Sequence, residues 1–473
     1  AIQRVRVVGT NALRMAKNRK AFTGPARRIL GTRVDVIYGL EEARLVYLGV
    51  AHSLADDAHS RLVIDIGGGS TEFIIGQRFE PQFMESLQMG CVSYGKTFFP
   101  KGRISRDNFR NAYNQARAQT VPIRHSFRSK HWAECVGSSG TLQAIETILT
   151  QNGWSEGGID RQGLSTLEKT LLKYKLMDDI QVEGLVAQRR NVILPGVAIA
   201  SAVFDVLGID RMRTSRGALR EGVIYDLMGR LNHEDVRERT VNALMQRYAV
   251  DADTADIVER RARTLFAATR GRWQLTSDDW ELLHWLARTH EIGMAISHKH
   301  FNRHTAYLLR HADLPGFSQD EQELLAVLAL GHRGKLGADF FAAKADADLT
   351  RIMYLLTIIR LASCFKYVEK LEQLPDFSIV AKEKSLTLDF PKGWLKDHPL
   401  TAHALENELM RRHNLATRHG ETTRLVGLAA CRAIMAFGRG DYSRCVELLG
   451  RLPPWVQRIG GSHAQRDVLY LTL

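Results

Sequence analysis

Cysteine is scarce in this sequence of 473 residues. The cysteines are odd in number, lie far apart and form no CxxC pair: Cys91, Cys135, Cys364, Cys431 and Cys445. A disulfide framework needs paired cysteines, and a thiolate zinc site needs closely spaced ones. The sequence therefore predicts neither, and it indicates a protein of the reducing cytoplasm.

Long apolar runs are also missing. The best candidate for a membrane-spanning segment, residues 197–207, is interrupted by Ser201 and Asp205. A transmembrane helix needs about 20 predominantly apolar residues, and no signal peptide is recognisable either. We therefore expect a cytoplasmic protein that does not span a membrane. A peripheral association with a membrane surface is left open.

Acidic residues are fewer than basic ones. The chain has 52 Asp and Glu against 65 Lys and Arg, which gives a formal net charge of +13. Such a balance favours a polyanionic partner, such as nucleic acid, a phosphate polymer or an anionic membrane. The sequence has no aromatic-basic RNA motif and no helix-turn-helix signature, which argues against nucleic acid. A basic surface that serves only solubility is the alternative.

The pattern of apolar residues divides the chain into two regions of different predicted secondary structure. Strand-like and helical segments alternate in the first half, which predicts an α/β fold. Helical spacing dominates residues 231–369, and residues 374–398 read as a small hairpin. Glycine-containing turns follow three of the predicted strands, at residues 67–70, 137–140 and 215–217. We expect these turns to form one site at the sheet.

The first of these turns lies in LVIDIGGGSTEFIIG, residues 62–76. Glycines let backbone N–H groups approach an anion closely, and Ser70 and Thr71 add hydroxyl donors. Asp65 and Glu72 flank the turn, and two carboxylates beside a phosphate make sense only with a divalent cation such as Mg²⁺. A tight structural turn that binds no ligand is the alternative.

Two further side chains are candidates for the same site. Glu42 stands near the start of a predicted helix in GLEEARLVYLGVAH, and Arg14 closes VGTNALR. Acids are favoured in the first turn of any helix, so Glu42 could equally be a solvated helix end. Arg14 could equally lie on the surface. The order of the surrounding motifs favours a functional role for both.

The ordered set VGTNALR, GLEEARLVYLGVAH, VIDIGGGSTEFIIG, MGCVSY, VGSSGT and GALREG resembles the exopolyphosphatase/guanosine pentaphosphate phosphohydrolase (Ppx/GppA) family. The resemblance covers about residues 1–408. It implies actin-like ATPase (ribonuclease H-like) α/β domains, then an all-α HD-like domain and a small C-terminal region. The implied boundaries are 1–45 for the remnant of a first actin-like domain, 46–230 for the second, 231–369 for the HD-like domain, 370–408 for the small α/β region and 409–473 for a helical repeat-like tail.

The resemblance also implies roles for individual residues. Glu42 matches the general base that takes a proton from the attacking water, and Asp65 and Glu72 match the acids that hold Mg²⁺. The implied phosphate-binding residues are Arg14, Gly67, Gly68, Gly69, Ser70 and Thr71. Phosphoryl transfer to water needs charge neutralisation, positioning and an oriented nucleophile, and each need has a candidate here.

Two features favour the exopolyphosphatase branch of the family. The turn reads GGGSTE, where the other branch tends to GGASTE, and the later motif reads MGCVSY. The sequence thus predicts a Mg²⁺-dependent hydrolase that removes terminal phosphate from inorganic polyphosphate. Hydrolysis of the 5′-phosphate of guanosine pentaphosphate and an inactive phosphate-binding chain are the alternatives. The resemblance further implies a homodimer.

The sequence departs from the family in three places. Family members begin with a strand that bears an acid-Gly-Ser-Asn-Ser motif, which is absent here, so we expect an N-terminally truncated chain. HEIGM, with His290 and Glu291 at the His-Asp position, lacks the second histidine of a HExxH zinc site. This predicts an HD-like fold without a metal. Residues 409–473 resemble a tetratricopeptide-like repeat protein, through a gene fusion, a misassembled sequence or a designed chimera.

Overall fold

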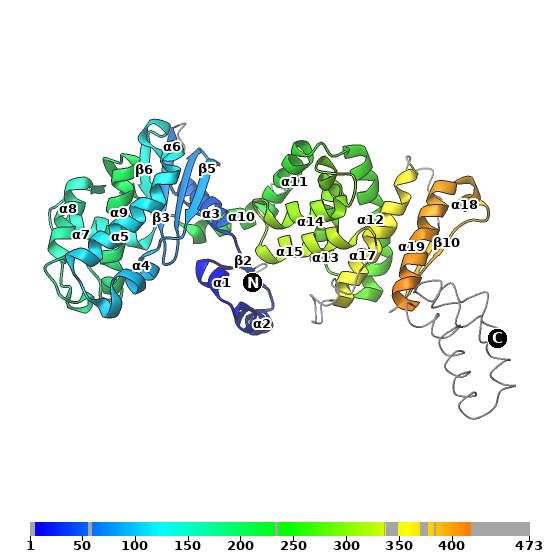
Figure 1. Ribbon diagram of the computed structural model, residues 1–473, viewed down its shortest axis with the longest axis horizontal. Coiled ribbons are helices and arrows are strands. Elements are labelled where there is room, and N and C mark those ends of the chain that lie inside the picture. Colours follow the sequence, from blue (N-terminus) through cyan, green and yellow to red (C-terminus); the bar gives the residue numbers. More distant parts are fainter. Residues whose placement is uncertain are drawn as a thin grey trace, which may run out of the picture. The chain divides into compact units, whose positions relative to one another are not determined.

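The computed structural model describes residues 5–54, 59–231, 235–334, 336, 349–368, 377–382 and 385–417 (Figure 1). The chain separates into two compact units. The first, the α/β unit, holds residues 1–244 and 309–324, and the second, the helical unit, holds residues 245–308 and 325–473. The predicted change from an α/β region to a helical region is confirmed. The finer boundaries at residues 45, 369 and 408 stay predictions.

A short parallel strand pair lies in the N-terminal part of the α/β unit. Strand β1 (Val7–Gly9) pairs with β2 (Val34–Val36), and helices α1 (Asn11–Met15) and α2 (Arg19–Leu30) lie between them in the chain. The predicted strand over residues 34–38 ends early because the next helix begins directly after it. The Tyr38 carbonyl already accepts the first helical hydrogen bond of α3 (Gly39–Ser53), from the backbone N–H of Glu42.

A six-stranded sheet forms the centre of the α/β unit, in the order β5-β4-β3-β6-β8-β7. Strands β3, β4 and β5 form an antiparallel meander, β6 and β8 continue the sheet in parallel with β3, and β7 is antiparallel to β8. The strand bounds are β3 Ser60–Ile66, β4 Thr71–Gln77, β5 Glu80–Leu87, β6 Glu134–Gly137, β7 Ile159–Asp160 and β8 Arg211–Thr214. The quoted glycine turn joins β3 to β4.

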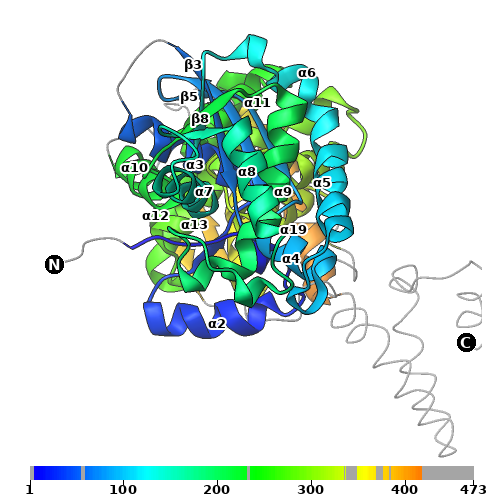
Figure 2. The ribbon, with the colours of Figure 1, turned by 90° about the vertical axis from the view of Figure 1, so that its left-hand side faces the viewer.

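Helices cover both faces of this sheet. Their bounds are α4 Cys91–Phe98, α5 Arg106–Thr120, α6 Arg124–Phe127, α7 Gly140–Gln151, α8 Arg161–Leu171, α9 Arg190–Leu207 and α10 Leu219–Leu231. Alternate residues of β3 point to opposite faces. Leu62 and Ile64 join the core with α4, α5, α7, α8 and α9, whereas Val63 packs with α3. Helices α5, α8 and α9 thus lie on the face opposite α3, and Figure 2 shows them side by side.

Helix α3 is anchored against α10. A Cβ on Gly222 would lie 1.8 Å from the carbonyl oxygen of Leu45, so only glycine permits this close crossing. Nearby, the buried Arg44 guanidinium bonds Glu41 at 2.8 and 2.9 Å and Asp226 at 2.5 Å. These ion pairs hold the start of α3, and therefore the neighbouring Glu42, in place.

Helix α9 is the most apolar helix of the α/β unit. Among the described residues, the segment Ala187–Leu207 is the one candidate long and apolar enough to cross a membrane, and 72% of its most apolar 18-residue window is buried inside the fold. Its residues contribute heavily to the main core of the α/β unit. We attribute its apolar character to this packing.

The helical unit contains most of the remaining elements. Helices α11 (Val236–Arg247), α14 (Phe301–His311) and α15 (Gln319–Gly331) each have one end in the α/β unit by the division above. The other bounds are α12 Ala252–Trp273, α13 Ser277–Thr289, α17 Leu349–Cys364, α18 Trp394–Asp397 and α19 Pro399–Thr417. The 3₁₀ turns within the described ranges are Pro100–Gly102, Val121–Ile123, Ser129–His131, Met177–Asp179, Ala187–Arg189, Ile292–Ala295 and Phe365–Tyr367.

A small hairpin lies between α17 and α18 in the chain, as the alternation over residues 374–398 predicts. Strand β9 (Ser378–Ala381) is antiparallel to β10 (Leu386–Asp389). The indole Nε1 of Trp273 donates to the carbonyl of Lys382 at 2.9 Å, which ties the hairpin to α12. The predicted tail over residues 409–473 lies outside the described residues beyond Thr417.

Candidate active site at the glycine turn

The first turn of α3 places two glutamates in different surroundings. Glu41 is buried, pairs with Arg44 and accepts the backbone N–H of Gly316 at 2.9 Å. The carboxylate of Glu42 points to Arg14 instead, at 2.7 Å from Nη1, and its side chain is 12% exposed. Neither acid is a solvated helix end, so that interpretation of the EEAR segment is wrong.

Arg14 is a buried side chain, not a surface arginine. Its Nη1 donates to Glu42 and to the carbonyl of Ile37 at 2.9 Å, and its side chain is 8% exposed. Its Nη2 is buried and has no hydrogen-bond partner among the described residues. Because an unsatisfied buried guanidinium nitrogen is costly, this donor is suited to an anionic ligand beside Glu42.

The glycine turn brings its two flanking acids together. The backbone N–H of Gly67 donates to the carbonyl of Ser70 at 2.9 Å, and this closes the turn. Asp65 on β3 and Glu72 on β4 are direct cross-strand partners. The two carboxylates therefore lie on the same side of the hairpin, at its turn end.

The MGCVSY segment, residues 89–94, holds the glycine turn by hydrogen bonds. The backbone N–H groups of Cys91 and Val92 donate to the carbonyls of Gly67 and Gly68, each at 2.9 Å. The sequence suggested that the Thr71 hydroxyl donates a hydrogen bond to phosphate. It donates instead to the carbonyl of Met89, at 2.5 Å. In this structure Thr71 is fully buried and holds the turn in shape.

Asn11 is a site residue that the sequence reasoning missed. A Cβ built on Gly69 would lie 2.1 Å from its Oδ1, so the amide lies directly against the glycine turn. Its Nδ2 donates to Oε1 of Gln88 at 3.0 Å. Asn11 stands within the VGTNALR motif, three residues before Arg14, and this spacing on a helix was the available signal.

The three glycine-containing turns meet, as expected. Ser138, from VGSSGT, has its hydroxyl 3.2 Å from Oδ2 of Asp65 and 3.3 Å from the carbonyl oxygen of Gly217, in the third turn. On the other side, the Ser86 hydroxyl donates to Glu72 at 2.9 Å. Arg216, by contrast, is exposed on the third turn. Hydroxyl groups thus orient both acids of the hairpin.

Mutual repulsion and burial govern the protonation of the carboxylates. Burial, with the negative charge of Glu42, raises the pKa of Asp65 to about 6, although the bond with Ser138 opposes the rise. Burial, Glu42 and Asp65 raise the pKa of Glu72 well above its ordinary value, against the bonds from Ser70 and Ser86. Burial also raises the pKa of Glu42, and Arg14 opposes this. A cation among the three acids would relieve the repulsion.

The donor set fits Mg²⁺ rather than a protein-caged metal. Among the residues that the structure describes, no group of three or more His, Cys, Asp or Glu side chains is arranged to hold a metal ion. Mg²⁺ is typically held by one or two carboxylates, with the rest of its shell from water and substrate phosphates. Asp65 and Glu72, paired across the hairpin, can supply two such ligands.

The site therefore combines buried carboxylates, an unpartnered guanidinium nitrogen and a glycine turn, which is an arrangement for phosphoryl transfer. Comparison with known proteins agrees. The model of the Ppx/GppA phosphatase family matches residues 1–231, and that of Ppx/GppA phosphatase domain III matches residues 236–409. The chain belongs to the Ppx/GppA phosphatase family, whose members hydrolyse phosphoanhydride bonds, and it is an enzyme of that kind.

The relatives come from several bacteria. The chain is 37% identical over 413 residues to a guanosine-5′-triphosphate,3′-diphosphate pyrophosphatase of Photobacterium profundum, which covers 87% of this chain and 82% of that protein. It is 37% identical over 407 residues to the protein of the same name from Pseudoalteromonas translucida, with 86% and 81% covered. A crystal structure of the Aquifex aeolicus Ppx/GppA family member has 26% identity and a TM-score of 0.43, with 49% of this chain and 76% of that chain covered.

Proposed function

We propose that this enzyme hydrolyses the 5′-terminal phosphoanhydride bond of guanosine pentaphosphate at the glycine turn. The observation that carries the assignment of the site is the arrangement of Arg14. One of its nitrogens holds the candidate base Glu42, and the other is buried with no partner in the described part of the chain. A phosphate bound by the free nitrogen would lie beside the base.

The choice of substrate corrects the order of the sequence-based predictions. Two relatives that are 37% identical are named for guanosine-5′-triphosphate,3′-diphosphate, and this supports the alternative over inorganic polyphosphate. The local motifs GGGSTE and MGCVSY pointed the other way. A few residues in a turn weigh less than similarity over more than 400 residues, because the turn would bind the phosphate that both substrates share.

Inorganic polyphosphate is the second candidate. The net charge of +13 favours a long polyanion, and the turn motifs resemble those of exopolyphosphatases. Both substrates present a terminal phosphoanhydride, so the same residues would serve either reaction.

In the proposed reaction Glu42 accepts a proton from water as the water attacks the terminal phosphorus. A general base works best when its pKa lies near the working pH, and the raised pKa of Glu42 moves it in that direction. Arg14 orients Glu42 and donates to an oxygen of the phosphoryl group. The N–H of Gly67 is engaged by the Ser70 carbonyl, so the turn would offer the backbone N–H groups of residues 68–69 to the same group.

Asp65 and Glu72 would hold Mg²⁺ in this proposal. When bound, the ion would neutralise charge on the phosphoryl group as it is transferred. Ser138 and Ser86 keep the two carboxylates oriented. A cytoplasmic location and a homodimer belong to the same proposal, and light scattering of the purified chain would test the dimer.

Phosphate release from both substrates by one preparation tests the function. With Mg²⁺ present, we expect kcat/KM for guanosine pentaphosphate to exceed that for long-chain polyphosphate by about tenfold or more, which is about 1.4 kcal/mol of discrimination. The reverse ratio would establish the exopolyphosphatase as the correct assignment. No release from either substrate would contradict a phosphatase role for this chain.

A further inference from the structure

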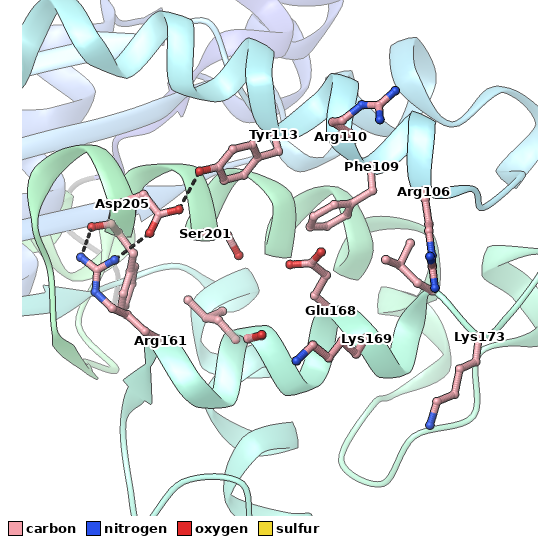
Figure 3. Close-up of a pocket in the computed structure, with 14 residues that line it drawn as sticks. Arg106, Phe109, Arg110, Tyr113, Arg161, Glu168, Lys169, Lys173, Ser201 and Asp205 are labelled. Atoms are coloured by element: carbon pink, nitrogen blue, oxygen red, sulfur yellow. Dashed lines mark hydrogen bonds and ion pairs between the residues drawn. The ribbon is translucent and has the colours of Figure 1, made fainter.

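A second cavity lies in the α/β unit, away from the carboxylates. It measures about 840 Å³ and is walled by α5, α8 and α9, which lie on the face of the sheet opposite α3 (Figure 3). Ligand pockets commonly have volumes of about 300–1,000 Å³. The cavity is therefore large enough for a small organic molecule, and it is separated from Glu42 by the sheet.

The floor of this cavity is apolar. Phe109, Leu164 and Phe204 line it, and each is at most 5% exposed. The hydroxyls of Ser165 and Ser201 also line the cavity, and that of Ser201 is buried and has no hydrogen-bond partner among the described residues. Figure 3 shows Ser201 and Phe109 facing the interior from neighbouring helices. Because the fold already covers nearly all of these apolar side chains, a flat apolar group of a ligand would contact the small part of them that stays exposed.

One end of the cavity is closed by a hydrogen-bonded set. Asp205 accepts from the Tyr113 hydroxyl at 2.6 Å and from Arg161 Nη1 at 2.6 Å. Arg110, also at the rim, is paired with Asp107 at 2.8 Å. The charges of Arg161 and Arg110 are therefore already balanced within the fold.

The other end carries three cations, one of which, Lys169, lies close enough to Glu168 to oppose the rise that burial causes in the pKa of that carboxyl. Arg106, Lys169 and Lys173 line the cavity, and in the described part of the chain they make no side-chain hydrogen bond or ion pair. Figure 3 shows Arg106 and Lys173 at the end away from Asp205, with Lys169 between. Glu168 is half-buried in the middle, where its carboxyl can accept from hydroxyl or amino groups.

We propose that this cavity is a second ligand site, for a nucleotide-sized organic phosphate whose ring lies on the apolar floor and whose phosphates meet Arg106, Lys169 and Lys173. Inorganic polyphosphate would satisfy the cations but leave the apolar floor uncovered. An uncharged hydrophobe would do the reverse. Only a ligand with both parts matches the two ends of the cavity.

Binding of ADP, GDP and inorganic pyrophosphate, measured by calorimetry on the full chain, tests the proposal. The informative variant is Lys169→Glu with Lys173→Glu, and the matched control is Arg124→Glu with Lys130→Glu, two exposed cations outside the cavity. We expect the first pair to weaken binding of a nucleotide by about tenfold or more, because charge-assisted hydrogen bonds are lost. The control should bind as the wild type does.

Two further comparisons separate this site from the glycine turn. Ser165→Trp would fill the cavity without reversing charge and should also weaken nucleotide binding, with an unchanged thermal melt as the check on folding. Arg14→Met should leave this binding intact. Nucleotide binding that depends on Arg14 and not on Lys169 and Lys173 would overturn the proposal, as would pyrophosphate binding as tightly as the nucleotides.

Discussion

The α/β unit and the helical unit each bury a cluster of titratable side chains, but the clusters differ in what they leave unsatisfied. At the glycine turn, Glu42, Asp65 and Glu72 repel one another, and the adjacent Arg14 keeps a buried donor that finds no partner among the residues that the structure describes. In the helical unit, the rings of His290 and His332 lie 5.5 Å apart, edge to face. Both clusters are candidate functional sites when only the sequence is considered. The charges and hydrogen bonds around them show how they differ.

The histidine pair is tied to its own backbone. Nδ1 of His290 bonds the carbonyl of Ala287 at 2.7 Å, and Nδ1 of His332 bonds that of Ala329 at 2.6 Å. Burial lowers the pKa of His290, and burial with the nearby His290 lowers the pKa of His332 to about 3. Both rings are therefore neutral. Nε2 of His332 is also buried without a hydrogen-bond partner among the described residues, but on a neutral ring whose Nδ1 donates to Ala329 it is an uncharged acceptor and not a charged donor. Burial of ionisable groups alone therefore does not indicate catalysis. Carboxylates that repel one another beside a charged donor with no partner among the described residues do.

Glu42→Gln should give the largest effect of any single change at the glycine turn. It removes the proton acceptor and keeps the volume, so kcat should fall by about 10²–10⁴-fold with KM little changed. Phosphate release from guanosine pentaphosphate measures this. Glu156→Gln, an exposed acid of the same unit, is the control. A rate within twofold of wild type would show that Glu42 is not the base.

Arg14→Lys should lower kcat/KM by about 10–100-fold, because lysine cannot donate to the base and to a phosphate with the geometry of a guanidinium. The same assay measures the change, and Arg124→Lys, an exposed residue, is its control. Full activity with lysine would mean that charge alone suffices and that the free nitrogen has no phosphate to bind.

Asp65→Asn should raise the Mg²⁺ concentration needed for half-maximal activity by about tenfold or more, because a charged ligand is replaced by a neutral one. A Mg²⁺ titration of turnover measures this, with Asp178→Asn as the exposed control. An unaltered titration curve would count against a metal-binding role for Asp65.

The histidine pair should affect stability and not turnover. The folded-state pKa of His332 lies below the unfolded value of about 6.5. Below pH 6.5 the unfolded chain therefore binds a proton that the folded one refuses, and stability is lost as the pH falls. We expect a loss of about 2 kcal/mol at pH 5 from this group.

Urea unfolding of the helical unit at pH 7.5 and pH 5 checks this loss, with His332→Gln as the comparison. The variant should show a correspondingly smaller difference between the two pH values, while its phosphate release at neutral pH stays near that of wild type. An equal pH dependence in both proteins would contradict the assignment.

The sequence predicted the parts of the site that lie within short motifs. Asp65, Glu72, Glu42 and Arg14 each stand at a fixed place in such a motif, and the fold brings them to one hairpin end. The change from an α/β pattern to a helical pattern near residue 231 could also be predicted, because helical periodicity is a local property of the sequence. Local pattern therefore located both the candidate site and the two structural classes.

What the sequence did not reveal depends on contacts between distant segments. Asn11 lies against Gly69 only because α1 folds over the hairpin, and Thr71 is tied to Met89 only because the two segments pack together. The cavity between α5, α8 and α9 draws its side chains from these helices and from the two residues after α8, spread over about a hundred residues, so no single stretch of sequence displays it. In the sequence, its cations cannot be distinguished from other exposed Lys and Arg residues.

A double-mutant cycle on Glu42 and Arg14 tests the central claim most directly, with guanosine pentaphosphate turnover measured for wild type, Glu42→Gln, Arg14→Lys and the double variant. If the two side chains act as one unit on one phosphate, the double variant should be no more than about threefold slower than Glu42→Gln. Losses that multiply would contradict this account, because they would show that the pair joined at 2.7 Å does not act together.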